Sequence, residues 1–230
     1  MRNYRYFDLI LGAFAVTLVV SNIASTKIAT LSLGVWKPVF DGGTFLFPLT
    51  YIFGDVLTEV YGYARSRRVI WFGLAMNLLA ALIFGLVGLL PTEASSPTKG
   101  AFEAVLGFVP QIVLASLAAF FVGEFLNAFV LAKMKVATKG RWLWTRTLGS
   151  TLIGQGADTL TFTLLAFGIG ANALPREVLW QIIGFNYLYK VGIEALLTPA
   201  TYAVVGFLKR AEHEDYYDKD TNFNPFALGR

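Results

Sequence analysis

Cysteine is absent from this 230-residue chain, and histidine occurs only once, at His213. Without cysteine the protein can form no disulfide and no thiolate metal site. The single histidine lies in a polar C-terminal stretch, which argues against a membrane metalloprotease and against a histidine proton relay. The sequence therefore predicts no metal site and no cofactor.

Charged residues are also scarce. They make up 15% of the chain, whereas a soluble domain is nearer a quarter charged. Hydrophobic residues make up 56%, and the mean hydropathy is +0.59. This is enough apolar sequence for about six membrane crossings of roughly 20 residues each. The net charge of +4 does not indicate nucleic-acid binding, because the basic residues fall in short stretches between apolar runs. We expect an all-α, polytopic membrane protein embedded in the lipid bilayer.

Six apolar segments can be delimited, and they span residues 7–26, 44–63, 69–90, 108–132, 147–169 and 177–208. Residues 28–43 are too short to cross a bilayer. Their β-branched residues and glycine pair predict a short hairpin or re-entrant piece after the first helix. Residues 91–107, rich in proline, serine, threonine and glycine, are predicted to form a loop. We expect a six-helix membrane domain over residues 1–208 and a polar cytoplasmic tail over 209–230.

The distribution of lysine and arginine predicts the orientation. With the N-terminus in the cytoplasm, the cytoplasmic segments hold fourteen of these residues and the outer segments hold four. Both termini are therefore expected to be cytoplasmic. Six helices divide into two sets of three, and because three is odd the second set is inverted relative to the first. Inverted three-helix halves commonly place a transporter's substrate at the membrane midplane. No residue-level similarity between the halves accompanies this topological argument.

The second segment contains the stretch FPLTYIFGDVLTEVYG, residues 47–62, which carries two carboxylates. Asp55 and Glu59 are four residues apart, so a helix places them on one face, one turn apart. Pro48 and Gly54 weaken a regular helix here. An acid inside hydrocarbon is costly and is therefore rare without a function. A structural interpretation remains open, in which both acids pair with a basic group and lock helices together.

Three further acids fall deep in other segments: Glu124, Asp158 and Glu194. Lys190 is the one base at similar depth, and with Glu194 it forms a supporting pair in the last segment. One lysine cannot neutralise five carboxylates, so some must be protonated, bind a cation or hydrogen-bond a ligand. Proton coupling is a natural hypothesis. We assign proton coupling or gating to the three glutamates, which are Glu59, Glu124 and Glu194.

Amide and aromatic side chains accompany these acids. Together they suit a flat, nitrogen-rich heterocycle that is neutral or cationic, because carboxylate and amide oxygens accept from N–H groups and aromatic rings stack on ring faces. The predicted substrate-binding set is Asn22, Phe47, Tyr51, Asp55, Gln155, Asp158, Asn186, Tyr187 and Lys190. Asn22 could equally hydrogen-bond a neighbouring helix.

Four stretches carry a family resemblance: FPLTYIFGDVLTEVYGYARSRRVI, GSTLIGQGADTLTFTLLAF, NYLYKVGIEALL and the tail phrase DKDTNFNPF. They resemble the queuosine-precursor transporters of bacteria, also called vitamin uptake transporters. The resemblance implies a six-helix inner-membrane importer of 7-deazaguanine precursors, in their cyano and aminomethyl forms, for tRNA-modification salvage. It implies that the family's polar positions fall on Asp55, Gln155, Asp158, Tyr187 and Lys190. The resemblance gives less support for a role of Glu59 in the site.

Two alternatives differ in mechanism. The chain could be the substrate-binding membrane subunit of an ATP-driven vitamin importer, with an ATPase module as its partner. It could instead be a membrane-embedded enzyme, for which Asp55 and Asp158 would have to form an aspartyl pair. We predict a transporter and no enzymatic activity, acting on a small nitrogen heterocycle, either alone or as a homodimer.

Overall fold

Helices make up nearly all of the computed structural model, which describes residues 4–24, 27–30, 39–93, 95–96, 100–106, 110–169 and 175–227. The helices are α1 (Phe7–Ala24), α2 (Phe47–Val56), α3 (Tyr63–Gly88), α4 (Ala101–Leu106), α5 (Pro110–Ala137), α6 (Leu143–Phe167) and α7 (Arg176–Glu212). A short antiparallel pair joins β1 (Ile28–Thr30) to β2 (Val39–Asp41), and a 3-10 turn over Gly42–Phe45 follows. The all-helical class is confirmed, and the hairpin expected after the first helix is present.

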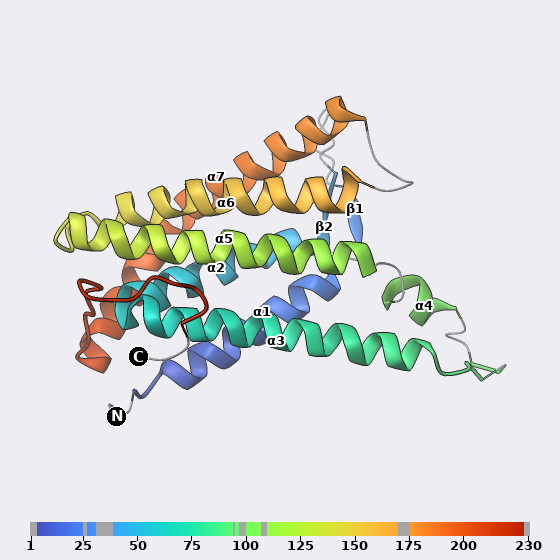
Figure 1. Cartoon of the computed structure of the whole chain (residues 1–230), viewed down its shortest axis with the longest axis horizontal. Coiled ribbons are helices and arrows are strands. Elements are labelled where there is room, and N and C mark those ends of the chain that lie inside the picture. Colours follow the sequence, from blue (N-terminus) through green and yellow to red (C-terminus); the bar gives the residue numbers. More distant parts are fainter. Residues whose placement is uncertain are drawn as a thin grey trace.

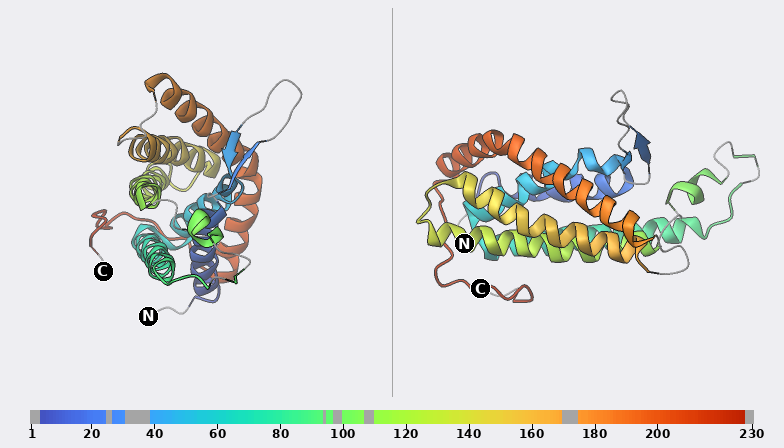
Figure 2. Two further views of the ribbon diagram at one scale, coloured as in Figure 1. Left: turned by 90° about the vertical axis from the view of Figure 1, so that its right-hand side faces the viewer. Right: turned by 90° about the horizontal axis from the view of Figure 1, so that it is seen from above.

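The long helices lie side by side along the long axis of the molecule (Figure 1). Both chain termini lie at one end, called the terminal end below, together with the junction between α2 and α3. The β1–β2 pair and α4 lie at the opposite end. The view from above in Figure 2 shows α7 crossing obliquely over its neighbours.

Within the described residues, four helical stretches are long and apolar enough to cross a membrane, and they are Phe7–Ala24, Tyr63–Gly88, Leu114–Ala137 and Ile182–Glu212. They make the chain a multi-pass membrane protein. α6 has nearly the length of α3, but its mean hydropathy is too low for a membrane span of this kind. α2 is too short to cross a membrane. The two elements that differ from ordinary membrane spans are thus α6 and α2, and both carry acids of the predicted site.

Glycine positions the closest helix pair, α5 and α6. A Cβ atom on Gly123 of α5 would lie 2.6 Å from the Cβ of Asp158, and one on Gly154 of α6 would lie 2.8 Å from the Cβ of Asn127. Small residues permit such close approach between membrane helices. The contact brings Asp158 and Asn127, two polar side chains, into the interior of the protein.

The second apolar segment is not one regular helix. α2 ends at Val56, a π-helical turn follows over Leu57–Tyr61, and Gly62 breaks the chain with a φ of +85°. Single π-helical turns are rare and occur frequently at functional sites. A side chain at position 62 would be strained by this φ and would also collide with the ring of Tyr216.

Several predicted boundaries are wrong, and the tail explains one of them. α3 begins at Tyr63, so the basic run 64–68 is helical and does not precede the helix. The backbone N–H of Tyr63 donates to both carboxylate oxygens of Asp218, at 3.1 and 3.0 Å, and this satisfies a donor at the helix start. The predicted loop over 91–107 contains α4.

Candidate functional site

Asp55 lies in the last turn of α2 and is completely buried. Its Oδ1 accepts a hydrogen bond of 3.0 Å from the Nδ2 of Asn127 on α5. Its Oδ2 has no hydrogen-bond partner in the described part of the protein. The charges of Glu194 and Glu124 act on Asp55, so carboxylates from α2, α5 and α7 converge here.

Glu124 packs directly against the backbone of α2. A Cβ atom on Gly54 would lie 2.0 Å from the Oε1 of Glu124, so only glycine leaves room for this carboxyl group. Both carboxyl oxygens of Glu124, and both of Glu194, are buried without a hydrogen-bond partner among the described residues. Asp55, Glu124 and Glu194 are called the acid cluster below.

Lys190 pairs with Asp158 and not with Glu194, its expected companion in α7. The Nζ of Lys190 lies 2.6 Å from the Oδ2 of Asp158, and the two side chains are only 13% and 10% exposed. The charges of Asp158 and Glu194 both act on Glu124, which connects this ion pair electrostatically with the acid cluster. Beside the pair, the Tyr187 hydroxyl donates to the carbonyl oxygen of Leu152 at 3.1 Å.

A polar stripe follows one face of α6 with a spacing of four residues, and it consists of Thr147, Thr151, Gln155, Thr159 and Thr163. All five side chains are at most 2% exposed. The stripe rises about 24 Å along the helix, most of the thickness of a bilayer's hydrocarbon core. From Thr151 onward, every member has a buried polar atom without a partner in the described structure. The spacing was visible in the sequence, but Gln155 is the one member of the stripe that the predicted site included.

Unpartnered polar atoms in a membrane interior are energetically costly. Each buried donor or acceptor without a hydrogen bond costs about 1–3 kcal/mol. Here such atoms come from α2, α5, α6 and α7, and they include both amide atoms of Gln155 and one oxygen of Asn127. The arrangement can accept hydrogen bonds from several N–H groups and can donate one from an amide. It therefore suits a polar ligand with both kinds of group.

Glu59 belongs to a different cluster, and this corrects the expected excess of five acids over one base. Its Oε1 accepts from Arg146 at 2.7 Å and from Lys209 at 2.7 Å, and its Oε2 accepts from Arg146 at 3.2 Å. The Nζ of Lys135 lies 3.6 Å from the same Oε1. For Glu59 the interpretation of a helix-locking ion pair is therefore the one that the structure supports.

The observed helix ends explain why these lysine and arginine residues were predicted to lie in loops. α5 continues to Ala137, α6 begins at Leu143, and α7 continues to Glu212, so each helix extends four or five residues beyond its predicted limit. Basic residues that were expected in loops are carried on these extensions. Lys135 and Arg146 are consequently almost completely buried.

The tail completes this cluster through Asp215, whose Oδ1 lies 2.6 Å from the Nζ of Lys135 and 2.9 Å from that of Lys209. Partial burial by itself would raise the pKa of Asp215, but the two ammonium groups outweigh it and hold the pKa below its usual value. The ionic network, as named below, comprises Glu59, Lys135, Arg146, Lys209 and Asp215. It ties α5, α6, α7, the π-helical turn and the tail together.

The rest of the tail docks on α3. Arg67 donates to the carbonyl oxygens of Asn222 and Asn224 at 2.7 and 2.8 Å, and the Trp71 indole donates to that of Pro225 at 2.8 Å. The ring of Phe223 lies against that of Tyr63, with 5.0 Å between centroids. The phrase DKDTNFNPF thus has a visible structural role at the terminal end.

Four of the predicted site residues are not shown to reach the acid cluster. Asn22 bonds neighbouring helices, because its Nδ2 donates to Asn77 of α3 and its Oδ1 accepts from Ser116 of α5 at 3.1 Å. Asn186 lies half-buried on α7, one turn before Lys190. The backbones of Phe47 and Tyr51 belong to α2, and their side chains fall outside the described structure.

Replacing Gly54 with alanine tests the fit between α2 and Glu124. The added methyl group must displace the Glu124 carboxyl, and overpacking of this kind typically costs about 1–3 kcal/mol. For the transport function that the sequence resemblance implies, we expect uptake to fall by about tenfold or more, measured with labelled substrate in whole cells. Gly85→Ala on α3, where a Cβ would meet nothing within 4 Å, is the matched control and should leave uptake unchanged. Equal uptake by the two variants would show that Glu124 does not need its position against Gly54.

The fold and its buried polar centre define a multi-pass helical membrane protein, and in the described part of the chain no group of three or more histidine and carboxylate side chains could hold a metal ion. Comparison with known proteins now gives its family. The chain belongs to the family described as "Putative vitamin uptake transporter", whose model matches residues 41–204. This confirms the resemblance seen in the sequence. Members of this family are transporters, in agreement with the expectation of no enzymatic activity.

Three relatives show the similarity. A "Probable queuosine precursor transporter" of Bacillus subtilis (strain 168) is 31% identical over 162 residues, which is 70% of this chain and 69% of the relative. The "Queuosine precursor transporter" of Escherichia coli (strain K12) is 29% identical over 71% of each chain. A "Probable queuosine precursor transporter" of Haemophilus influenzae is 28% identical over 71% of this chain and 67% of the relative. No solved structure matches the chain.

Proposed function

We propose that this protein imports queuosine precursors, the cyano and aminomethyl forms of 7-deazaguanine, across a bacterial inner membrane for tRNA-modification salvage. The observation that carries the proposal is the group of buried, unpartnered polar atoms contributed by α2, α5, α6 and α7. The names of three relatives, each a queuosine precursor transporter, support the choice of substrate. An ATP-driven vitamin importer has no comparable support.

The chemistry of the substrate complements that of the site. A deazaguanine edge presents a ring N–H and an exocyclic amine, which donate to carboxylate oxygens such as those of Asp55 and Glu124. Gln155 can donate to a ring carbonyl and accept from an N–H. The aminomethyl form adds a cationic group that an acid cluster favours. In this proposal Asp55, Gln155 and Asp158 bind or gate the substrate, and Tyr187 and Lys190 support them from α7.

For the topology we propose six crossings in two inverted three-helix halves, with the terminal end in the cytoplasm. Successive long elements run in alternate directions along the long axis, as this requires (Figure 1). Residues 1–208 would form the membrane domain and 209–230 the cytoplasmic tail. The basic residues of the α3 start and of the α5–α6 turn gather at the terminal end, in accord with the rule that cytoplasmic segments are positively charged.

The ionic network and the acid cluster would then have different roles. The ionic network lies at the terminal end. By locking the helices together there, it would close the path from the acid cluster to the cytoplasm, and in this proposal Glu59 gates that path. Glu124 and Glu194 have no basic hydrogen-bond partner among the described residues, and we assign proton coupling to them. The polar stripe of α6 would line the path between the two sides of the membrane.

Binding of the two deazaguanines to the purified protein tests the proposal, with adenine as a comparison compound. In Asp55→Asn the site loses one charged acceptor, and a hydrogen bond to a charged group contributes about 1.5–3 kcal/mol. We expect affinity for both precursors to fall by about tenfold to a hundredfold, as measured by calorimetry. Asp8→Asn, which neutralises an exposed acid on α1, should bind as the parent protein does.

Two results would contradict the proposal. Failure of the parent protein to bind either deazaguanine would remove the substrate assignment while leaving the fold as described. Equal affinities for the Asp55→Asn and Asp8→Asn variants would show that the acid cluster does not contact the ligand.

A further inference from the structure

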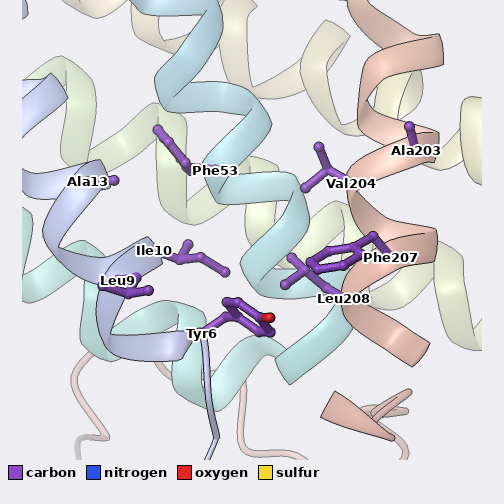
Figure 3. A pocket seen from close by; sticks show the side chains of 9 residues that line it. All are labelled: Tyr6, Leu9, Ile10, Ala13, Phe53, Ala203, Val204, Phe207 and Leu208. Carbon is purple, nitrogen blue, oxygen red and sulfur yellow. The ribbon is translucent and has the colours of Figure 1, made fainter. Parts of the chain in front are cut away.

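A groove separates α1 from α7 at the terminal end, and it is apolar apart from one tyrosine hydroxyl. Its volume is about 470 Å³, and it is a shallow groove that is largely open at the protein surface. Figure 3 shows side chains from α1 on one side, side chains from α7 on the other, and Phe53 of α2 between them. Leu9 at its edge is 68% exposed and Phe207 is 50% exposed, so the groove opens on the outer surface of the protein.

Aromatic rings close the terminal end of the groove. The rings of Tyr6 and Phe207 meet edge to face, with 5.6 Å between their centroids. The guanidinium carbon of Arg5 lies 5.4 Å from the centre of the Tyr6 ring. A positive charge is therefore held at the groove mouth by a side chain that lines the groove.

A second arginine flanks the same mouth from α7. Arg210 lies three residues after Phe207, close to the same helical face, and its Nη1 extends back to 3.8 Å from the position of a Cβ on Gly206. Arg5 and Arg210 are both exposed, and neither forms an ion pair with a described residue.

The buried carboxylate of Glu212, at the end of α7, already accepts three hydrogen bonds. Glu212 accepts from the backbone N–H groups of Arg5 and Tyr6, at 2.9 and 2.7 Å, and from the Tyr61 hydroxyl at 3.0 Å. These three bonds fix the start of α1 against the end of α7. They also leave the two guanidinium groups available for an external anion.

We propose that this groove binds an anionic phospholipid, with one acyl chain between α1 and α7 and the headgroup phosphate between Arg5 and Arg210. The apolar walls offer nothing to a hydrogen-bonding substrate but suit a hydrocarbon chain. The groove faces outward from a helix that is long and apolar enough to span a bilayer. Basic sites between membrane helices on the cytoplasmic side recognise anionic headgroups. The site is separate from the acid cluster and does not depend on the identity of the transported molecule.

Native mass spectrometry of the full chain, purified in detergent and titrated with phosphatidylglycerol or phosphatidylcholine of matched acyl chains, tests this site. The parent protein should retain phosphatidylglycerol preferentially. One basic residue near an anionic lipid strengthens binding about fivefold, so Arg5→Gln combined with Arg210→Gln should lower the preference by roughly thirtyfold. Lys139→Gln combined with Arg141→Gln removes the same charge from exposed positions at the same end, and should leave the preference unchanged.

A second pair of variants tests the groove itself. Ala13→Leu and Ala203→Leu narrow it from opposite sides without altering charge, and each should reduce retention of both lipids. Equal lipid preference in the two double-glutamine variants, or unchanged retention in both leucine variants, would overturn the site. A parent protein that is dimeric and becomes monomeric in the leucine variants would also overturn it, since a second copy would then fill the groove.

Discussion

Replacing Asp158 with asparagine is expected to reduce uptake of labelled precursor to the level of cells that lack the transporter. The substitution removes a charged acceptor at the polar centre and breaks the ion pair of 2.6 Å between Asp158 and Lys190. Removing one member of a buried ion pair typically costs about 3–5 kcal/mol. A single substitution therefore cannot separate lost binding from lost stability.

A double variant makes that separation. Asp158→Asn combined with Lys190→Met removes both charges, so thermal stability should recover most of what the single variant lost, because no uncompensated charge remains. Uptake should stay at background if Asp158 contacts the substrate. The measurements are thermal unfolding of the purified proteins and uptake normalised to the amount of protein in the membrane.

The opposite pattern would be equally informative. If the double variant regains uptake together with stability, the ion pair holds α6 to α7 and takes no part in binding. Asp158 would then leave the site, and the acid cluster alone would remain as the place where substrate binds.

Replacing Glu59 with glutamine should cause a loss of stability as large as that expected for Asp158→Asn. Glu59 is fully buried and interacts with Arg146, Lys135 and Lys209. Glutamine would leave Lys135 and Lys209 with Asp215 and would remove the acidic partner of Arg146. We expect the free energy of unfolding to fall by about 3–5 kcal/mol. The measurement is thermal or chemical unfolding in detergent.

Glu177→Gln provides the matched control. Glu177 is exposed in the first turn of α7, and surface substitutions of this kind usually change stability by less than about 0.5 kcal/mol. Unfolding of Glu59→Gln at the same temperature as this control would contradict the role of the ionic network in joining the helices. Increased permeability of Glu59→Gln to precursor would add support for gating, provided that the protein remains folded.

Local patterns in the sequence predicted the helical class correctly, and the acids that they singled out are buried in the structure. Long apolar runs indicate membrane helices whatever their partners are, because the bilayer requires every backbone polar group to be satisfied within the segment. Positions such as Asp55 and Asp158 are recognisable because a charge is costly at that depth. The hairpin between the first two segments was also predictable from its turn residues and β-branched residues.

Pairing between distant residues was not predictable in the same way. Nothing near Glu59 in the chain indicates Arg146 or Lys209 as its partners, and the sequence count treated its charge as uncompensated. The same limit applies to Lys190, which was expected beside Glu194 but pairs with Asp158. Residues that were overlooked, such as Thr151 and Thr163, show their importance only through burial on α6.

By itself, the sequence determined that this protein lies in a bilayer and carries acids within it, because hydrophobicity and charge are properties of single residues and short segments. Only the tertiary structure decided which acids are neutralised. Helix ends at the terminal end of the molecule carry lysine and arginine to Glu59, whereas close contact between glycine-lined helices leaves Asp55, Glu124 and Glu194 together without a base. Charge compensation depends on distances of a few ångströms between segments far apart in the chain, and folding alone sets those distances.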